Sequence, residues 1–268
     1  MKVSCIVPVL DREERLTEVL EQLRSVLHDI PHETIIVWDV TRLEWLPEIR
    51  QEQRELEARY GVRVLTRTDE RGFGSALRTG ARVAEGDVIV PIMADCSDDL
   101  ATIPAMLTKI EEGADIVAGS RYIAGGGIVG DTFKQRTSRL YSWLLHLVTG
   151  APCHDFSNSF KAYRRRVWEE IETEADSFDI SVEITVKALV RGLKVAEVPS
   201  VWTNRKLGQS HFRMGREALN YGRWAIYATL WRPRPLSKKA MVLALGGLIA
   251  FFLARVTRRH DKTREGRR

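Results

Sequence analysis

The chain has 268 residues, three scattered cysteines and a hydrophobic share of 44%, which fits one large α/β domain in a reducing cytosolic setting and excludes a polytopic membrane protein. Its formal net charge of +5 is carried entirely by residues 255–268, which hold seven basic and two acidic side chains. A neutral body with a basic tail favours contact with an anionic membrane surface and argues against a nucleic-acid-binding protein.

Predicted strands and helices alternate through the first half of the chain. A continuous apolar run predicts a buried strand over residues 3–9, and further strands are predicted over residues 34–38, 62–65, 88–93 and 115–118. Apolar residues at helical spacing predict helices over residues 14–27, 45–60, 75–84 and 101–112. This order predicts a mostly parallel sheet with helices on both faces. Because ligands of such sheets bind beyond the carboxyl ends of the strands, we expect the site just after Val9, Trp38, Met93 and Ala118.

The second half of the chain is less regular. A flexible loop is expected at Gly125, Gly126 and Gly127. The spacing of apolar residues predicts helices over residues 139–148, 181–191 and 215–231, and a strand over 195–201. The aromatic residues of the last of these helices, Trp224, Tyr227 and Trp231, suit the interface between a membrane and water.

An uncharged, mostly apolar segment covers residues 240–254. As a helix it would be about 22 Å long, which is short for a hydrocarbon core of about 30 Å. We expect it to attach the chain to a membrane, either across the bilayer or in its interface. The alternative is a buried core helix with a solvated tail. The expected organisation is therefore a catalytic domain (1–213), an amphipathic helix with a linker (214–236), and a hydrophobic helix with a basic tail (237–268).

A group of carboxylates follows the fourth predicted strand. Asp95 stands at the strand end, and Asp98 and Asp99 come shortly after it. Mg²⁺ or Mn²⁺ prefers one or two carboxylates together with phosphate oxygens, so Asp95 and Asp98 are candidate metal ligands. The alternative for Asp98 and Asp99 is that they cap the helix that follows.

Four further motifs are weak when taken singly. A glycine-rich turn, Glu70-Arg71-Gly72-Phe73-Gly74, leads into a helix and favours anions, although it lacks the third glycine of a dinucleotide fingerprint. Arginines and lysines follow the fifth strand, which predicts phosphate binding there. The remaining two motifs are a run from His154 to Lys161 and a basic loop from Arg205 to Ser210.

Together and in this order, the motifs resemble family 2 glycosyltransferases of the dolichol-phosphate mannosyltransferase type. The resemblance covers residues 2–213, and Met93 stands where this family usually has the first Asp of an Asp-x-Asp pair. The matching segments are Glu70-Arg71-Gly72-x-Gly74-x-Ala76, Ala94-Asp95, Gly119-Ser120-Arg121-Tyr122-x-x-Gly125-Gly126, Asp155-x-x-Asn158-Ser159-Phe160, Glu197-Val198-Pro199 and Arg205-x-x-Gly208-x-Ser210. The implied fold is the Rossmann-like GT-A fold, followed by amphipathic and membrane-seeking helices.

The resemblance also implies roles for individual residues. Asp95 would bind the metal that bridges the donor diphosphate, Arg121 would meet phosphate, and Asp155 would lie near the reacting sugar. These three are the expected catalytic residues. The implied nucleotide-sugar site contains Pro8, Val9, Leu10, Asp11, Asp39, Arg71, Gly72, Ala94 and Asp95. The implied phosphate and acceptor site contains Arg121, Lys134, Arg136, Ser138, Arg205 and Ser210.

The implied activity is metal-dependent, inverting transfer of a sugar from a GDP- or UDP-sugar to a polyprenyl or dolichyl phosphate. A membrane-associated protein with a cytoplasmic catalytic domain is expected. The partners considered are the donor, the lipid-phosphate acceptor, the membrane and a second copy of the chain. Two alternatives stay open. One is a catalytically impaired partner subunit, which Met93 would favour. The other is a glycosyltransferase that acts on a soluble or polysaccharide acceptor.

Overall fold

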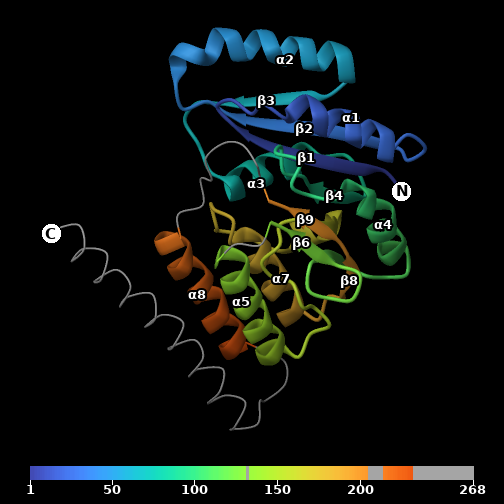
Figure 1. Cartoon of the computed structure of the whole chain (residues 1–268), viewed down its shortest axis with the longest axis vertical. Coiled ribbons are helices and arrows are strands. Elements are labelled where there is room, and N and C mark those ends of the chain that lie inside the picture. Colours follow the sequence, from blue (N-terminus) through green and yellow to red (C-terminus); the bar gives the residue numbers. More distant parts are fainter. Residues whose placement is uncertain (131–132, 205–213, 232–268) are drawn as a thin grey trace, which may run out of the picture.

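The computed structural model describes residues 1–130, 133–204 and 214–231 (Figure 1). Its central sheet has seven strands in the order β3-β2-β1-β4-β7-β5-β8. Neighbouring strands run parallel except at β7, which is antiparallel to both β4 and β5. The strands are β1 (Val3–Leu10), β2 (His32–Asp39), β3 (Arg63–Arg67), β4 (Val88–Pro91), β5 (Ile116–Ser120), β7 (Lys161–Arg164) and β8 (Val195–Pro199). A second, two-stranded sheet pairs β6 (Gly127–Val129) with β9 (Val201–Thr203).

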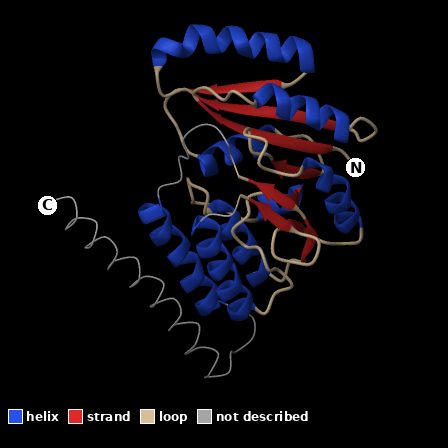
Figure 2. Cartoon of the chain, in the orientation of Figure 1, coloured by secondary structure: helices blue, strands red, loops and turns tan. Residues whose placement is uncertain are grey.

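Helices cover both faces of the sheet (Figure 2). They are α1 (Leu16–Val26), α2 (Leu46–Tyr60), α3 (Phe73–Val83), α4 (Ile103–Glu111), α5 (Phe133–Thr149), α6 (Arg165–Glu170), α7 (Ile180–Val190) and α8 (Met214–Trp231), with 3-10 turns η1 (Leu43–Trp45) and η2 (Leu100–Thr102). One apolar core contains Leu16 of α1, Ile49 of α2 and Ile103 of α4. The other contains residues of α3, α5, α7 and α8, among them Leu77 and Leu145. The predicted mostly parallel sheet with helices on both faces is confirmed.

The antiparallel strand β7 was not predicted. It pairs Tyr163 with Ile89 of β4 and Ala162 with Val117 of β5, and so lies between two strands that precede it in the chain. Its four residues begin with a lysine and end with an arginine, so they lack the apolar run that marks the other strands. The short strand β6 and helix α6 were missed as well. The strand expected over residues 195–201 is divided at Ser200 into β8 and β9.

The helix expected over residues 215–231 is confirmed as α8, but the expected place of Trp224 at a membrane interface is wrong. Its side chain is only 2% exposed, and its Nε1 donates a hydrogen bond of 2.8 Å to Asp179 at the start of α7. A buried indole N–H needs an acceptor, and Asp179 supplies one. Residues 232–268, with the apolar segment 240–254, lie outside the described residues. Among the helices that the structure describes, none combines the length and apolarity needed to cross a membrane.

Candidate active site

The parallel strands bring four loops to one edge of the sheet. β1, β2 and β4 are parallel neighbours, and β5 runs in the same direction because β7 is antiparallel to both β4 and β5. The loops after Leu10, Asp39, Pro91 and Ser120 therefore meet at the same edge, as expected. Because β7 separates β4 from β5, the ends of those two strands lie roughly 10 Å apart, about two strand spacings.

The loops after β1 and β2 are fastened together by Asp11. Its backbone has a φ of 54°, and its carboxylate accepts hydrogen bonds from the Thr41 amide (2.7 Å) and the Thr41 hydroxyl (2.6 Å). The carbonyl of Asp11 accepts a bond of 2.6 Å from Trp38 Nε1. Farther out, Arg12 and Arg42 both stack on the ring of Trp45. The predicted nucleoside residues Pro8, Val9, Leu10 and Asp11 thus belong to a fixed rim.

Asp39 at the end of β2 is buried against Arg67 at the end of β3. The guanidinium binds both carboxylate oxygens, with Nε–Oδ1 at 2.6 Å and Nη2–Oδ2 at 2.8 Å. Oδ2 also accepts the Gly72 amide at 3.0 Å. Arg67 Nη1 bonds Ser75 and Thr79 of α3. Asp39 therefore anchors the glycine-rich turn, whereas the neighbouring Arg71 is exposed.

The glycine-rich turn packs closely on the segment before α7. A Cβ at Gly74 would lie 2.1 Å from the Ala175 carbonyl oxygen, so no other residue fits there without a shift of the backbone. The Gly74 amide donates to the Asp176 carbonyl at 2.9 Å, and Phe73 stacks on Phe178. The buried Glu183 carboxylate holds the other side of that segment through the Ala175 amide. The glycines of this motif thus serve close packing.

The acidic loop after β4 holds two buried carboxylates, Asp95 and Asp98. Asp95 Oδ1 accepts the Ser97 amide at 3.1 Å, and Asp98 Oδ2 accepts the Met93 amide at 3.0 Å. No side-chain bond caps η2 or α4, so the capping alternative for Asp98 is not the role that the structure shows. Burial raises the pKa of Asp98 to about 7, and the nearby charges of Asp95 and Asp99 add to that effect.

This donor set fits a divalent cation that also binds phosphate. Two adjacent buried carboxylates repel each other, and a cation between them and a diphosphate would relieve that repulsion. Within the described residues there is no group of three or more His, Cys, Asp or Glu side chains suited to a metal. Phosphate and water oxygens commonly complete the shell of a Mg²⁺ ion that one or two carboxylates hold.

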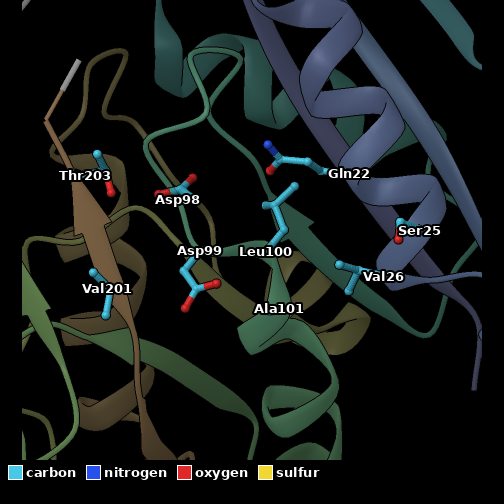
Figure 3. A pocket seen from close by; sticks show the side chains of 9 residues that line it. All are labelled: Gln22, Ser25, Val26, Asp98, Asp99, Leu100, Ala101, Val201 and Thr203. Carbon is cyan, nitrogen blue, oxygen red and sulfur yellow. The ribbon is translucent and has the colours of Figure 1, made fainter. Parts of the chain in front are cut away.

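A pocket of about 390 Å³ adjoins the same loop, between β9 and α1 (Figure 3). Its walls combine apolar side chains with polar ones, among them Asp98 and Asp99. The full lining is Gln22, Ser25, Val26, Asp98, Asp99, Leu100, Ala101, Val201 and Thr203. Asp98, one of the two predicted metal ligands, thus lines this pocket.

The loop after β5 presents Arg121 on a buried carboxylate. Arg121 Nε donates to Asp155 Oδ2 at 2.7 Å, and Nη2 donates to Oδ1 at 2.8 Å. The Arg121 amide donates to Oδ2 as well. Burial disfavours the charged carboxylate, but the charge and hydrogen bonds of Arg121 outweigh it, and the pKa of Asp155 is lowered. Asp155 is fully buried, so it contacts Arg121 rather than the crevice where the sequence placed it.

Hydroxyl groups surround the outer side of this pair. Arg121 Nη2 also donates to Ser138 of α5 (3.2 Å) and to Ser157 (3.1 Å). The hydroxyl of Tyr122 lies 3.0 Å from that of Ser138. Of the other predicted phosphate ligands, Arg136 is exposed on α5. Arg205 and Ser210 lie outside the described residues, as does the side chain of Lys134.

Two charged residues of this site were not singled out from the sequence. Lys161 of β7 is fully buried beneath the turn that carries Asp155. Glu197 of β8 accepts the amides of His154 and Asp155. Both belong to motifs that were identified in the sequence. The sequence signals for their burial were that Lys161 directly follows the apolar Phe160 and that Glu197 stands between Ala196 and Val198 in a short strand.

Comparison with known proteins gives the chain a family and a fold. The family described as "Glycosyl transferase family 2" matches residues 4–172. The dolichol-phosphate mannosyltransferase of Pyrococcus furiosus is 30% identical over 235 residues, which are 86% of this chain and 64% of that longer protein. The chain thus spans less than two thirds of that relative. The polyprenol monophosphomannose synthase of Mycolicibacterium smegmatis is 33% identical over 186 residues, covering 65% of this chain and 69% of that one.

A solved structure shares the fold. Glucosyl-3-phosphoglycerate synthase of Mycobacterium tuberculosis, in complex with Mn²⁺, UDP and phosphoglyceric acid, superposes with a TM-score of 0.61. The alignment covers 87% of this chain and 80% of the other at 18% identity. At that identity the likeness shows the fold alone.

Proposed function

The chain belongs to glycosyltransferase family 2 and has the GT-A fold, and from this premise we propose that it transfers a sugar from a GDP- or UDP-sugar to a polyprenyl or dolichyl phosphate. The observation that carries the acceptor is the hydrogen bonding of the Arg121 guanidinium, whose side chain is 8% exposed. Its Nε and Nη2 are spent on Asp155 and two serines, and within residues 1–130, 133–204 and 214–231 no hydrogen bond uses Nη1. The names of both curated relatives agree with a lipid-phosphate acceptor.

The donor would lie across the edge of the sheet. Its nucleoside would contact the rim from Pro8 to Asp11, beside the Asp39–Arg67 pair and the Gly72 turn. Asp95 and Asp98 would hold Mg²⁺ or Mn²⁺ on the diphosphate. When bound, that ion would neutralise charge on the leaving nucleoside diphosphate. The roughly 10 Å between the ends of β4 and β5 leaves room for the reacting sugar between diphosphate and Arg121.

The attacking group would be an oxygen of the lipid phosphate. Its second pKa is about 6, so it is largely ionised at neutral pH and needs no strong base. Asp155 agrees with this because its lowered pKa and its bonds to Arg121 leave it unsuited to take a proton. Arg121 would orient the phosphate for direct displacement with inversion, and Asp155 would act through Arg121 as a positioning residue.

The exposed apolar side chains of α5 and α8 would face a lipid bilayer. The two helices pack together, with the Tyr141 hydroxyl donating to the Tyr221 carbonyl at 2.7 Å. Their outer sides leave Leu140, Trp143, Leu147, Ile226 and Leu230 exposed. The chain then runs on from Trp231 to the apolar residues 240–254. Membrane attachment with the catalytic domain on the cytoplasmic side therefore stays our proposal, as does the division at residues 213 and 236.

Vesicle flotation tests this attachment. Deleting residues 238–268 should release most of the protein from anionic vesicles. Neutralising only the tail arginines should weaken binding less than the deletion and lower its salt dependence, because burial of the apolar residues 240–254 should contribute more than the basic tail. The truncated protein should keep its affinity for the donor. If the truncated protein floats as well as the full chain, the α5–α8 face is the anchor and the tail assignment is wrong.

Transfer itself is tested with the full chain, Mn²⁺, labelled GDP- and UDP-sugars, and three acceptors: polyprenyl phosphate, phosphoglyceric acid and a polysaccharide. We expect a labelled lipid product only, and none from Asp95→Asn. A labelled soluble product would assign the soluble-acceptor alternative. An intact donor in every reaction would favour the impaired partner subunit, which Met93 suggests.

A further inference from the structure

Lys161 carries a positive charge in the interior, beneath the candidate acceptor site. It stands at the start of β7, and its side chain has no exposed surface. The ammonium donates to the carbonyl oxygens of Phe156 (2.8 Å) and Asn158 (2.6 Å), and lies 3.5 Å from that of Ser181 in α7. Its three N–H groups thus meet three acceptors.

Such a group is costly to bury. An unpaired ammonium in the interior loses several kcal/mol of hydration, and only well-placed acceptors or charges offset that loss. Apolar residues would fill the same volume at lower cost. The arrangement therefore makes sense if the charge does something for the residues around it, and two of its three acceptors belong to the turn 155–158.

That turn holds both members of the Arg121–Asp155 pair. Asp155 Oδ1 accepts the amide of Asn158 at 3.1 Å. The Asn158 side chain donates to the carbonyl of Gly119 at 2.7 Å, two residues before Arg121. Fixing the carbonyl of Asn158 through Lys161 therefore fixes the carboxylate and the strand end that presents the guanidinium.

Glu197 holds the other end of the turn. Its carboxylate Oε1 accepts the amides of His154 (2.7 Å) and Asp155 (3.0 Å), and its side chain is only 6% exposed. The carboxylate of Glu197 on β8 thus binds the amides at the start of the turn, and the ammonium of Lys161 on β7 binds carbonyls of the turn.

We propose that Lys161 is a positioning residue for the acceptor phosphate, which it serves by locking the turn 155–158 from below while Glu197 locks it from β8. The proposal rests on the proposed function, because the group that it positions, Arg121, is the proposed phosphate ligand. It predicts that loss of the ammonium misplaces Arg121 and weakens acceptor use, while the donor rim at β1, β2 and β3 is unaffected.

The titration of Lys161 gives this role a signature. Burial lowers the pKa of Lys161 to about 8. The titratable or charged groups that act on it are Cys153 before the turn, Asp155 in the turn, Arg121 after β5 and Glu197 on β8. Because the ammonium is the form that binds three carbonyls, acceptor use should fall as the pH rises through about 8, and the donor affinity should not follow.

Lys161→Met in the full chain tests the proposal, with the exposed Lys109→Met on α4 as control. Without substrates, hydrogen exchange should speed up at the amides of Asp155, Asn158 and Phe160 in Lys161→Met only. With donor and polyprenyl phosphate, kcat/KM for the acceptor should fall at least tenfold, donor affinity should stay within about twofold, and the fall near pH 8 should be lost. Glu197→Gln should lose less, because its amide oxygen still accepts the Asp155 amide.

The outcomes separate cleanly. If Lys161→Met keeps slow exchange in the turn and the wild-type acceptor KM, or only lowers the melting temperature, the positioning role is wrong. If Lys161→Met fails to fold, the wild-type pH profile decides, and a flat profile between pH 7 and 9 overturns the proposal. If the wild type transfers nothing to polyprenyl phosphate, the proposed function fails, and hydrogen exchange still tells whether Lys161 holds the turn.

Discussion

Two buried arginine–aspartate pairs lie at the same edge of the sheet, and they differ in what their arginines have left to donate. Arg67 binds Asp39 through Nε and Nη2, and its remaining N–H groups go to Ser75, Thr79 and the Gly72 carbonyl. Arg121 binds Asp155 in the same bidentate way, but among the described residues its Nη1 has no acceptor.

Two ion pairs of the same type therefore have different roles. All five N–H groups of Arg67 are spent inside the protein, so the Asp39–Arg67 pair can only hold β2, β3 and the glycine-rich turn together. In the Asp155–Arg121 pair the carboxylate binds Nε and Nη2 of the guanidinium, and Nη1 remains for a ligand. A planar fork held in this way suits recognition of phosphate.

The largest expected effect comes from breaking either pair. Asp155→Ala and Asp39→Ala should each lower the free energy of unfolding by about 3–5 kcal/mol, because each leaves a buried guanidinium uncompensated. Urea denaturation measures this. Asp176→Ala is the control, since its pair with Arg78 is largely exposed on the carboxylate side and should contribute less than about 1 kcal/mol. If Asp155→Ala and Asp39→Ala each lowered the free energy of unfolding by less than about 1 kcal/mol, the two buried pairs would not be the stabilising contacts that their burial implies.

The next largest effect on stability is expected where the glycine-rich turn packs against the segment before α7. Gly74→Ala places a Cβ 2.1 Å from the Ala175 carbonyl oxygen and should cost about 1–3 kcal/mol of stability, as overpacking usually does. Donor affinity should fall with it. Gly127→Ala is the matched control, because nothing lies within 4 Å of its Cβ position. Equal melting temperatures for the two variants would contradict the packing role.

Conservative arginine replacements should separate the two pairs kinetically. Arg121→Lys keeps the charge but loses the fork, so kcat/KM for the acceptor should fall at least tenfold, or about 1.4 kcal/mol. Arg67→Lys should mainly weaken donor binding, because it loosens the Gly72 turn. Initial rates and calorimetric titration of the donor measure the two effects. The same change of acceptor KM in both variants would mean that the pairs are not functionally distinct.

The sequence predicts the regular part of the fold well. β1 and β4 are mostly apolar, β2 contains the apolar run from Ile35 to Trp38, and α1 has apolar residues at helical spacing. These patterns are visible in the local sequence alone. β7 is different, because Lys161 makes it look polar and only the carbonyls around the ammonium explain its burial. The prediction for Trp224 was wrong for a related reason. The sequence of an aromatic helix face does not show whether the face contacts a membrane or a buried acceptor such as Asp179.

The candidate site was predictable in position but not in pairing. Asp39, Asp95 and Arg121 follow strand ends, where ligands of such sheets bind. Their partners are distant in sequence, because Arg121 and Asp155 are 34 positions apart and Asp39 and Arg67 are 28 positions apart. No local pattern encodes those contacts, so the sequence placed Asp155 against the sugar and Asp39 against the nucleoside without the arginines that hold them.

The central claim is that Arg121 presents a site for the phosphate of the acceptor, and the most direct test compares polyprenyl phosphate with the matching polyprenol. Rates are measured with saturating donor and Mn²⁺ for the wild type and for Arg121→Lys. We predict that the wild type glycosylates the phosphate and leaves the alcohol unchanged, and that Arg121→Lys loses most of its activity on the phosphate. Comparable rates on both lipids, unchanged by Arg121→Lys, would contradict the account.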